Sequence, residues 1–303
     1  MLRTGVVQHD GHGVQLTLDE IDRLGRGVPV VADVEPSGSM LMQEFHAAGG
    51  VPALVAELGD LFDLGAVTAS GRTWAEETAG VSVSGPAIRS RDNALTEDGA
   101  FAVVRGSLAP GGAMLKKSAA SPSLFRHRGP AVVFSSYEDM RERIDDPDLD
   151  VSPSSVLVLT GAGPVAVPGM PEWGHVPVPA RLAAAGVEDM VRVTDGRISG
   201  TAFGTCIVHV APEAGVGGPL ALVRDGDEVV LDVEAGSLDL AVPADELATR
   251  RDRWQPAPTE HRRGWPALYQ HHVTQADEGC DFDFLQTPAA EAPRLVEPVV
   301  GRS

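Results

Sequence analysis

Lysine and cysteine are both scarce in this chain of 303 residues. The two lysines, Lys116 and Lys117, are adjacent, and 43 acidic against 24 basic side chains give a net charge of −19. Nucleic acid is therefore not an expected partner, because binding phosphates requires clustered positive charge. An anionic substrate would need local cations or a metal ion at its binding site.

The two cysteines, Cys206 and Cys280, are far apart in the sequence. They cannot build a disulfide framework or a cysteine-rich metal site, and their scarcity fits a reducing compartment. No apolar run is long enough to span a bilayer, and the first ten residues lack the apolar stretch of a signal peptide. We therefore expect a cytoplasmic protein without a membrane partner.

What remains is a globular composition, with 43% hydrophobic and 22% charged residues, and a length of about two average domains. Thr17 and Glu20 form a capping box that predicts a helix over 18–24, and the apolar run 28–32 predicts a buried strand. Further helices are predicted over 40–48 and 52–62. The Gly-, Ser- and Thr-rich stretch 65–86 is interpreted as a crossover between domains.

From residue 87 onward the sequence is β-rich. The clearest local pattern is Asp225-Gly226, a hairpin signal between predicted strands 220–224 and 228–233, after which Ala235-Gly236 leads into a third strand, 237–242. Other expected strands are 100–105, 131–134, 156–160, 190–193 and 205–210, and expected helices are 137–144, 179–185 and 245–254.

Three glycine-punctuated loops, 161–179, 194–201 and 211–219, concentrate functional groups. In the first loop, Glu172 follows a rigid Pro-Gly-Met-Pro turn, which suits a ligand of a hard cation such as Mg²⁺; the alternative is a solvated loop residue. His175 could bind a metal or substrate, or be an ordinary surface histidine.

The second loop carries Arg197, which could clamp a carboxylate, and Ser199, a nucleophile or base if its pKa is lowered. No Gly-x-Ser-x-Gly motif surrounds Ser199, and the glycine spacing fails the dinucleotide fingerprint, so a serine hydrolase and a nucleotide site are disfavoured. His209 alternates with Ile207 and is expected to be a buried, hydrogen-bonded histidine. Either lysine could meet an anionic substrate or simply be solvated.

Read together in order, six motifs resemble the second half of the dihydroxy-acid and sugar-acid dehydratase family, and Leu16 to Asp19 and Pro36-Ser37-Gly38 resemble the segment before it. The six are Leu108-Ala109-Pro110-Gly111-Gly112-Ala113-Met114-Leu115-Lys116, Gly163-Pro164, Gly169-Met170-Pro171-Glu172, Thr194-Asp195-Gly196-Arg197-Ile198-Ser199-Gly200-Thr201, His209-Val210-Ala211-Pro212-Glu213-Ala214 and Gly217-Gly218-Pro219.

The resemblance implies a mixed α/β fold. Residues 1–85 would be the helical C-terminal part of the family's α/β domain, and residues 86–286 a swivelling, β-barrel-like β/β/α domain with a closing helix. Residues 287–303, rich in Pro, Ala and Glu, are expected to form a loose tail.

The resemblance also implies a hydro-lyase that removes water from a 2,3-dihydroxy carboxylate to give a 2-keto acid. In such enzymes an iron–sulfur cluster acts on the departing 3-hydroxyl and Mg²⁺ holds the carboxylate and 2-hydroxyl. Carried over by motif, Glu172 would be a Mg²⁺ ligand, Ser199 the base at C2, and Thr201 a residue that orients substrate or base, with Arg197 also binding substrate. Ser199 would need neighbouring cations to favour its alkoxide.

The departures from the family matter equally. The family's first half supplies the cluster cysteines together with an Asp and a modified Lys that hold Mg²⁺, and this chain lacks that half. We therefore expect no ligands of a [2Fe-2S] cluster here, and Glu172 alone would hold Mg²⁺ poorly. The segments 199–205 and 275–285 are more similar to the sugar-acid branch, which favours a pentonate or related aldonate as substrate.

Three hypotheses follow. The first is a truncated or split sugar-acid dehydratase that carries the catalytic base, needs a partner chain with the cluster-binding half, and is homo-oligomeric like the family. The second is a dihydroxy-acid dehydratase of branched-chain amino-acid biosynthesis, shortened in the same way. The third is a non-catalytic remnant or binding module that has kept the fold.

Overall fold

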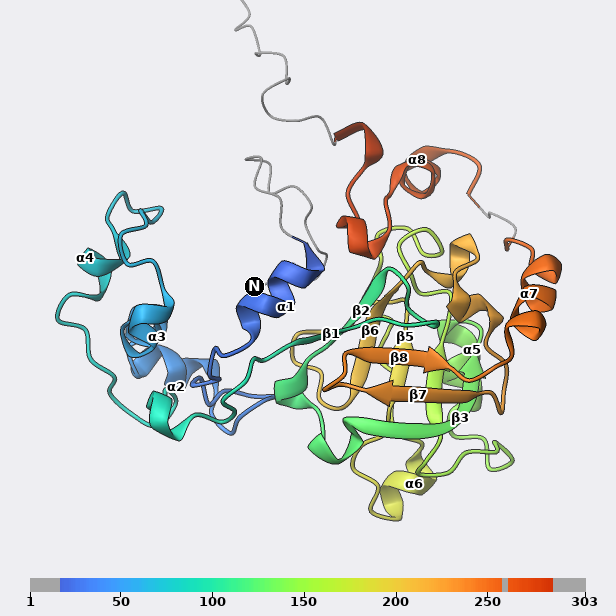
Figure 1. The fold of residues 1–303 in the computed structure, drawn as a ribbon, viewed down its shortest axis with the longest axis horizontal. Helices are drawn as coiled ribbons and strands as arrows, with labels where there is room; N and C mark the ends of the chain where they lie inside the picture. Colours follow the sequence, from blue (N-terminus) through green and yellow to red (C-terminus); the bar gives the residue numbers. More distant parts are fainter. Residues whose placement is uncertain (1–16, 258–260, 286–303) are drawn as a thin grey trace, which may run out of the picture.

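The computed structural model describes residues 17–257 and 261–285, and Figure 1 shows a small helical part connected by extended segments to a larger part built on one sheet. The helical part contains α1 (Leu18–Gly25), α2 (Met42–Ala47), α3 (Gly50–Leu58) and α4 (Trp74–Thr78). The predicted capping box of α1 is confirmed, since the Thr17 side chain accepts from the Glu20 N–H and the Glu20 carboxylate accepts from the Thr17 N–H at 2.8 Å.

The predicted strand over 28–32 is wrong. Val30 and Ala32 make only isolated bridges, to Thr96 and Ile88 respectively. A short 3-10 helix, η2 (Arg91–Asn93), lies between these two partners and prevents them from continuing as one strand. The predicted crossover 65–86 also contains α4.

The larger part is a nearly closed, barrel-shaped sheet of eight strands, which confirms the expected mixed α/β fold. The strand order is β1-β2-β6-β5-β4-β3-β7-β8, and a bridge from Arg105 to Ser237 links its two edges. The strands are β1 (Ala102–Val104), β2 (Gly112–Leu115), β3 (Arg126–Phe134), β4 (Val156–Leu159), β5 (Arg192–Thr194), β6 (Cys206–Ala211), β7 (Glu228–Asp232) and β8 (Ser237–Leu240).

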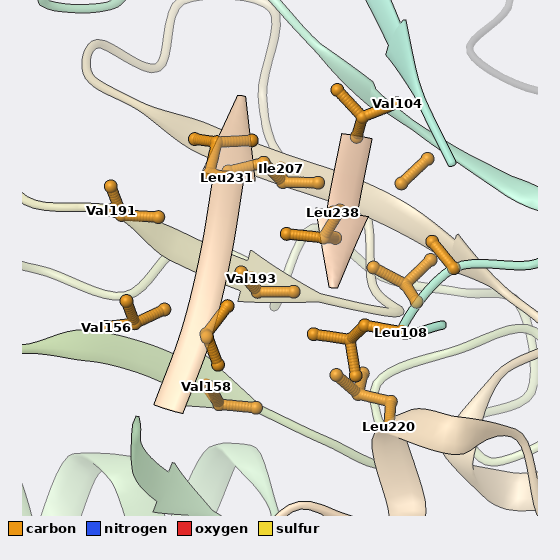
Figure 2. Packing of buried hydrophobic residues seen from close by; sticks show 14 of the residues in the cluster. Val104, Leu108, Val156, Val158, Val191, Val193, Ile207, Leu220, Leu231 and Leu238 are labelled. Atoms are coloured by element: carbon orange, nitrogen blue, oxygen red, sulfur yellow. The ribbon is translucent and has the colours of Figure 1, made fainter. Parts of the chain in front are cut away.

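The central strand β4 shows how the sheet is buried on both faces. Val156 and Val158 point into the barrel interior, where Figure 2 shows them packed with side chains from β5, β7 and β8. The alternate residues Leu157 and Leu159 belong to a second cluster that contains Met140 and packs outside the sheet. A continuous apolar run is expected for a parallel strand covered on both sides.

The predicted three-stranded meander is only partly correct. Residues 228–232 and 237–240 form the hairpin β7–β8, but 220–224 is not a strand, because Pro219 begins the 3-10 helix η6 (Pro219–Leu222). The other edge of β7 is paired with β3, so Asp225-Gly226 turns the chain into β7 without connecting two strands.

The helices around the sheet largely agree with the prediction. Those expected are α5 (Tyr137–Arg143), α6 (Ala180–Ala184) and α7 (Ala244–Arg253), whereas α8 (Gly264–His272) and strand β2 were not anticipated. The remaining 3-10 helices are η1 (Gly59–Leu61), η3 (Lys117–Ala119), η4 (Pro122–Leu124), η5 (Ala214–Val216), η7 (Ala276–Glu278) and η8 (Asp283–Leu285).

The predicted tail, 287–303, and the N-terminal ten residues lie outside the described residues. Within 17–257 and 261–285, none of the helices is both long and apolar enough to cross a membrane.

Candidate active site

The three predicted loops meet at one edge of the sheet. They follow β4, β5 and β6, which are neighbours and run parallel to one another. The carboxyl ends of parallel strands lie at the same edge, which is where open α/β sheets place their ligand sites. The topology therefore brings together segments that are up to about fifty residues apart in the sequence.

Asp195 connects all three loops. Its side chain is completely buried and accepts hydrogen bonds from the N–H groups of Gly161 (3.2 Å), Ala162 (2.9 Å) and Ala214 (2.9 Å). Burial raises the pKa of this carboxyl above its ordinary value, against the opposing effect of the three donors.

Glu213, after β6, makes a second buried connection. Its carboxylate accepts from the N–H groups of Val165 (2.8 Å) and Ala166 (2.9 Å) and from Nε2 of Gln275 (2.8 Å). Burial raises the pKa of Glu213 to about 7, and the nearby Asp195 adds to the shift. Neither carboxylate was singled out from sequence, although Asp195 directly follows β5 and Glu213 stands two residues after β6, and this position was the available signal.

Glu172 and Arg197 form an ion pair between the first and second loops. Arg197 Nη2 lies 3.8 Å from Glu172 Oε1, and both side chains are nearly half exposed. The backbones also touch, since the Gly174 N–H donates to the Arg197 carbonyl at 2.9 Å. A Cβ at residue 174 would lie 2.8 Å from that carbonyl oxygen, so the approach requires glycine.

Ser199 and Thr201 lie two residues beyond Arg197, with their hydroxyl oxygens 3.0 Å apart. Lys116 reaches the same turn and donates from Nζ to the Gly200 carbonyl at 2.9 Å. Burial lowers the pKa of Lys116. Lys117 instead pairs with Asp98, away from this turn. The structure thus places a carboxylate, an arginine, a lysine and two hydroxyls on adjoining loops.

Backbone strain is concentrated around these loops. Among the described residues, three that are not glycine have left-handed backbone: Met170 (φ 43°), His209 (φ 58°) and Cys280 (φ 52°). Met170 and Cys280 are in contact, with their sulfur atoms 3.8 Å apart, and the His209 N–H donates to the Gly196 carbonyl at 3.1 Å. Such strain is found preferentially at functional sites.

The two candidate histidines have different outcomes. His209 is buried as predicted, but its Nδ1 has no hydrogen-bond partner among the described residues, so the expectation that it is satisfied is wrong. Burial, with the charge of Arg197, lowers the pKa of His209 to about 4. His175 is exposed, which agrees with the surface alternative.

The cysteines do not form a metal site in the described part of the chain. Cys206 is buried in β6, where Arg192 Nη1 contacts its sulfur at 3.1 Å, and Cys280 lies beside Met170. No cluster of three or more His, Cys, Asp or Glu side chains suited to a metal ion occurs within residues 17–257 and 261–285. Glu172 therefore offers a single carboxylate.

The family of this chain follows from its similarity to known proteins. Residues 86–280 match the family described as dihydroxy-acid/6-phosphogluconate dehydratase C-terminal, and residues 6–77 match its N-terminal counterpart. The chain is 49% identical to a 6-deoxy-6-sulfo-D-gluconate dehydratase of Pseudomonas putida over 92% of its own length and 49% of that protein's.

Two further relatives belong to different branches. The chain is 46% identical to an L-arabonate dehydratase of Azospirillum brasilense, over 93% of this chain and 50% of that one. It is 39% identical to a dihydroxy-acid dehydratase of Moorella thermoacetica, over 92% and 50% respectively. The chain spans about half the length of the curated relatives it matches. Fold, motifs and identities agree, and the chain belongs to the dihydroxy-acid/6-phosphogluconate dehydratase family.

Proposed function

We propose that this chain is part of a hydro-lyase that converts an aldonic sugar acid to a 2-keto-3-deoxy acid, and that it carries the catalytic base. The observation that carries the proposal is that two loops lie next to each other: residues 161–179, here called the Glu172 loop, and residues 194–201, here called the Ser199 loop. The ion pair of Glu172 with Arg197 joins them. The named relatives support the substrate class, since identity is 46–49% to the sugar-acid dehydratases and 39% to the dihydroxy-acid dehydratase given above.

In the proposed step, the Ser199 alkoxide takes the proton from C2 of the substrate. The electron pair of that C–H bond forms the C2=C3 double bond, while the C3–O bond breaks and the leaving hydroxide takes up the proton that Ser199 removed, which forms water and restores the alkoxide. The resulting enol tautomerises to the 2-keto acid. Arg197 would bind the substrate carboxylate, and Thr201, 3.0 Å from Ser199 Oγ, would orient the base or substrate.

A serine alkoxide requires positive charge nearby, because an ordinary hydroxyl is too weak a base. Lys116 supplies one such charge at the turn that contains Ser199, through its bond to the Gly200 carbonyl. Arg197 supplies another, two residues before Ser199. In a chain with net charge −19, these local cations also favour an anionic substrate.

The family resemblance implies Mg²⁺ and a [2Fe-2S] cluster, but the described residues do not by themselves fit either group. Glu172 would be a single Mg²⁺ ligand, and Cys206 is buried against Arg192. We propose that the remaining ligands come from a polypeptide corresponding to the other half of the relatives' length, within a homo-oligomeric, cytoplasmic enzyme.

The test is reconstitution. The chain is co-expressed with a polypeptide covering the complementary half of the Azospirillum L-arabonate dehydratase, and 2-keto acid formation from a panel of aldonates and a branched-chain dihydroxy acid is measured. We expect turnover of an aldonate. Ser199→Ala should abolish turnover while substrate binding persists, and Ser123→Ala, an exposed serine in η4, is the matched control.

Three results would count against the proposal. Preference for the branched-chain acid would contradict the substrate class. Turnover that survives in Ser199→Ala would contradict the assignment of the base. A reconstituted complex that binds aldonates without converting them would favour the binding-module hypothesis.

A further inference from the structure

We propose that Asp195 and Glu213 are positioning residues: together they form a buried carboxylate clamp that fixes the Glu172 loop against the Ser199 loop. The relevance to catalysis rests on the proposed function, whereas the clamp itself is a property of this chain. Neither side chain faces solvent, since Asp195 is 0% and Glu213 1% exposed. Their role is therefore to act through other residues.

Asp195 sets the relation between the two loops. It stands in the Ser199 loop, four residues before that serine, yet its carboxylate accepts from Gly161 and Ala162 at the start of the Glu172 loop. Its third donor, Ala214, belongs to the loop after β6. One side chain thus joins the carboxyl ends of β4, β5 and β6.

Glu213 holds the middle of the Glu172 loop. Its two oxygens accept from the consecutive N–H groups of Val165 and Ala166, and Gln275, the residue before η7, donates to the same carboxylate. The fit is close: a Cβ at residue 163 would lie 2.5 Å from Glu213 Oε2. Glycine at 163 is therefore required for the carboxylate to reach these amides.

Individual contacts, and not regular secondary structure, hold the Glu172 loop in place; besides the two carboxylates they include the bond from Gln270 Nε2 to the Val165 carbonyl at 2.9 Å and the stacking of Trp173 on Tyr137. Residues 160–179 contain no helix or strand, and buried N–H groups without partners cost free energy. Four consecutive or near-consecutive amides, at 161, 162, 165 and 166, donate to the two carboxylates. Each of the two side chains holds two of these amides, so removing either acceptor should release the loop.

The first experiment measures amide hydrogen exchange in the full 303-residue chain. Glu213→Gln replaces one acceptor oxygen with an NH₂ group that cannot accept from an amide. Gly163→Ala disturbs the same contact from the other side, and Asp195→Asn tests the second carboxylate. The control is Asp227→Asn, which weakens the pairing of Asp227 with Arg250 near α7 and leaves the clamp intact.

We expect exchange of the amides in residues 161–172 to accelerate about tenfold or more in all three clamp variants, while β4 and β6 keep their protection. Asp227→Asn should lower thermal stability without accelerating that loop. Unchanged loop exchange in the clamp variants, or an increase spread evenly over the barrel, would overturn the proposal.

The second experiment uses the reconstituted dehydratase. If the clamp positions Glu172 against Ser199, kcat should fall about tenfold to a hundredfold in Glu213→Gln, with KM changing less, whereas the control variant keeps kcat. Loop release with unchanged kcat would overturn the positioning role. If the unmodified assembly shows no turnover, the proposed function fails, and the exchange measurement alone decides whether the clamp exists.

Discussion

The helical part and the barrel are stabilised in different ways. In the barrel, Leu157, Leu159 and Ile207 are completely buried and every strand has at least one hydrogen-bonded neighbour. In the helical part, the core is centred on Phe45, Ala48, Ala53, Ala87 and Ile88, while Val51 and Val67 are 50% and 69% exposed. Its segments are connected through isolated bridges and capped short helices.

This difference shows where accurate geometry can be maintained. The side chains of a catalytic site must keep a defined geometry relative to one another. Loops that extend from a buried sheet are positioned by a rigid scaffold. Glu172 and Ser199 extend from β4 and β5 in this way. The helical part has little buried area with which to position a functional group, and its stability should respond locally to substitution.

The largest expected effect comes from a matched pair of leucines. Leu157→Ala removes a completely buried side chain from β4 and should lower the free energy of unfolding by about 3 kcal/mol. Leu54→Ala removes a partly buried side chain from α3 and should cost about 1 kcal/mol. Urea titration followed by circular dichroism measures both. Equal losses would show that Leu54 is packed as tightly as Leu157 and would contradict the difference between the two parts.

Glu213 should give the barrel a distinctive pH dependence. Between pH 4.5 and about 7 the folded chain keeps a proton on Glu213 that the unfolded chain has released, so the free energy of unfolding falls as the pH rises. The shift corresponds to about 3 kcal/mol across that range. The titratable groups that interact with it are Asp195, Cys280 and Tyr269.

The measurement is the unfolding free energy of the unmodified chain and of Glu213→Gln at pH 5 and pH 7.5. The substituted chain should lack this downward component, so the difference between the two chains should shrink as the pH rises. A difference that does not vary with pH would mean that Glu213 has an ordinary pKa.

His209 should give the free energy of unfolding a pH dependence of the opposite sign. The observable effect should be somewhat smaller, because other groups titrate in the same pH range. Its pKa of about 4 means that the unfolded chain binds a proton below pH 6.5 that the folded chain does not. The unfolding free energy should therefore fall as the pH is lowered from 6.5 to 4, by up to about 3 kcal/mol. His209→Asn, which tolerates the left-handed backbone, should remove that component. The same acid sensitivity in both chains would exclude His209 as its source.

The sequence predicted those features of the fold that depend on local patterns. The capping box of α1, the apolar run of β4 and the helix α5 all appear where expected, because caps and periodicity act over a few residues. The strand expected at 220–224 does not form for two reasons. Its expected partner β7 pairs instead with β3, about ninety residues earlier in the sequence, and Pro219 begins the 3-10 helix η6. Strand β2 was not predicted, because Gly111 and Gly112 at its start indicated a loop.

The same distinction between local patterns and distant contacts applies to the residues of the candidate site. Glu172, Arg197 and Ser199 could be singled out from their motifs, and the structure places their loops together, while their chemical roles stay predictions. Asp195 and Glu213 were not singled out, because only their position after β5 and β6 marks them locally, and what distinguishes them is burial against amides from another loop. Such contacts between distant residues leave no periodic signal in the sequence.

The smallest expected effect compares two helix caps. Thr73 caps α4 in the helical part and Ser136 caps α5 beside the barrel, each accepting from an N–H group three residues later. Loss of either hydroxyl should cost about 1 kcal/mol, but the cost should appear in different places. Ser136→Ala should lower the global free energy of unfolding, because α5 packs on the sheet through Met140. Thr73→Ala should accelerate amide exchange within residues 73–78 and leave the unfolding of the barrel unchanged, since α4 contributes no buried side chain. A global loss from Thr73→Ala would show that the helical part supports the barrel more than its small core suggests.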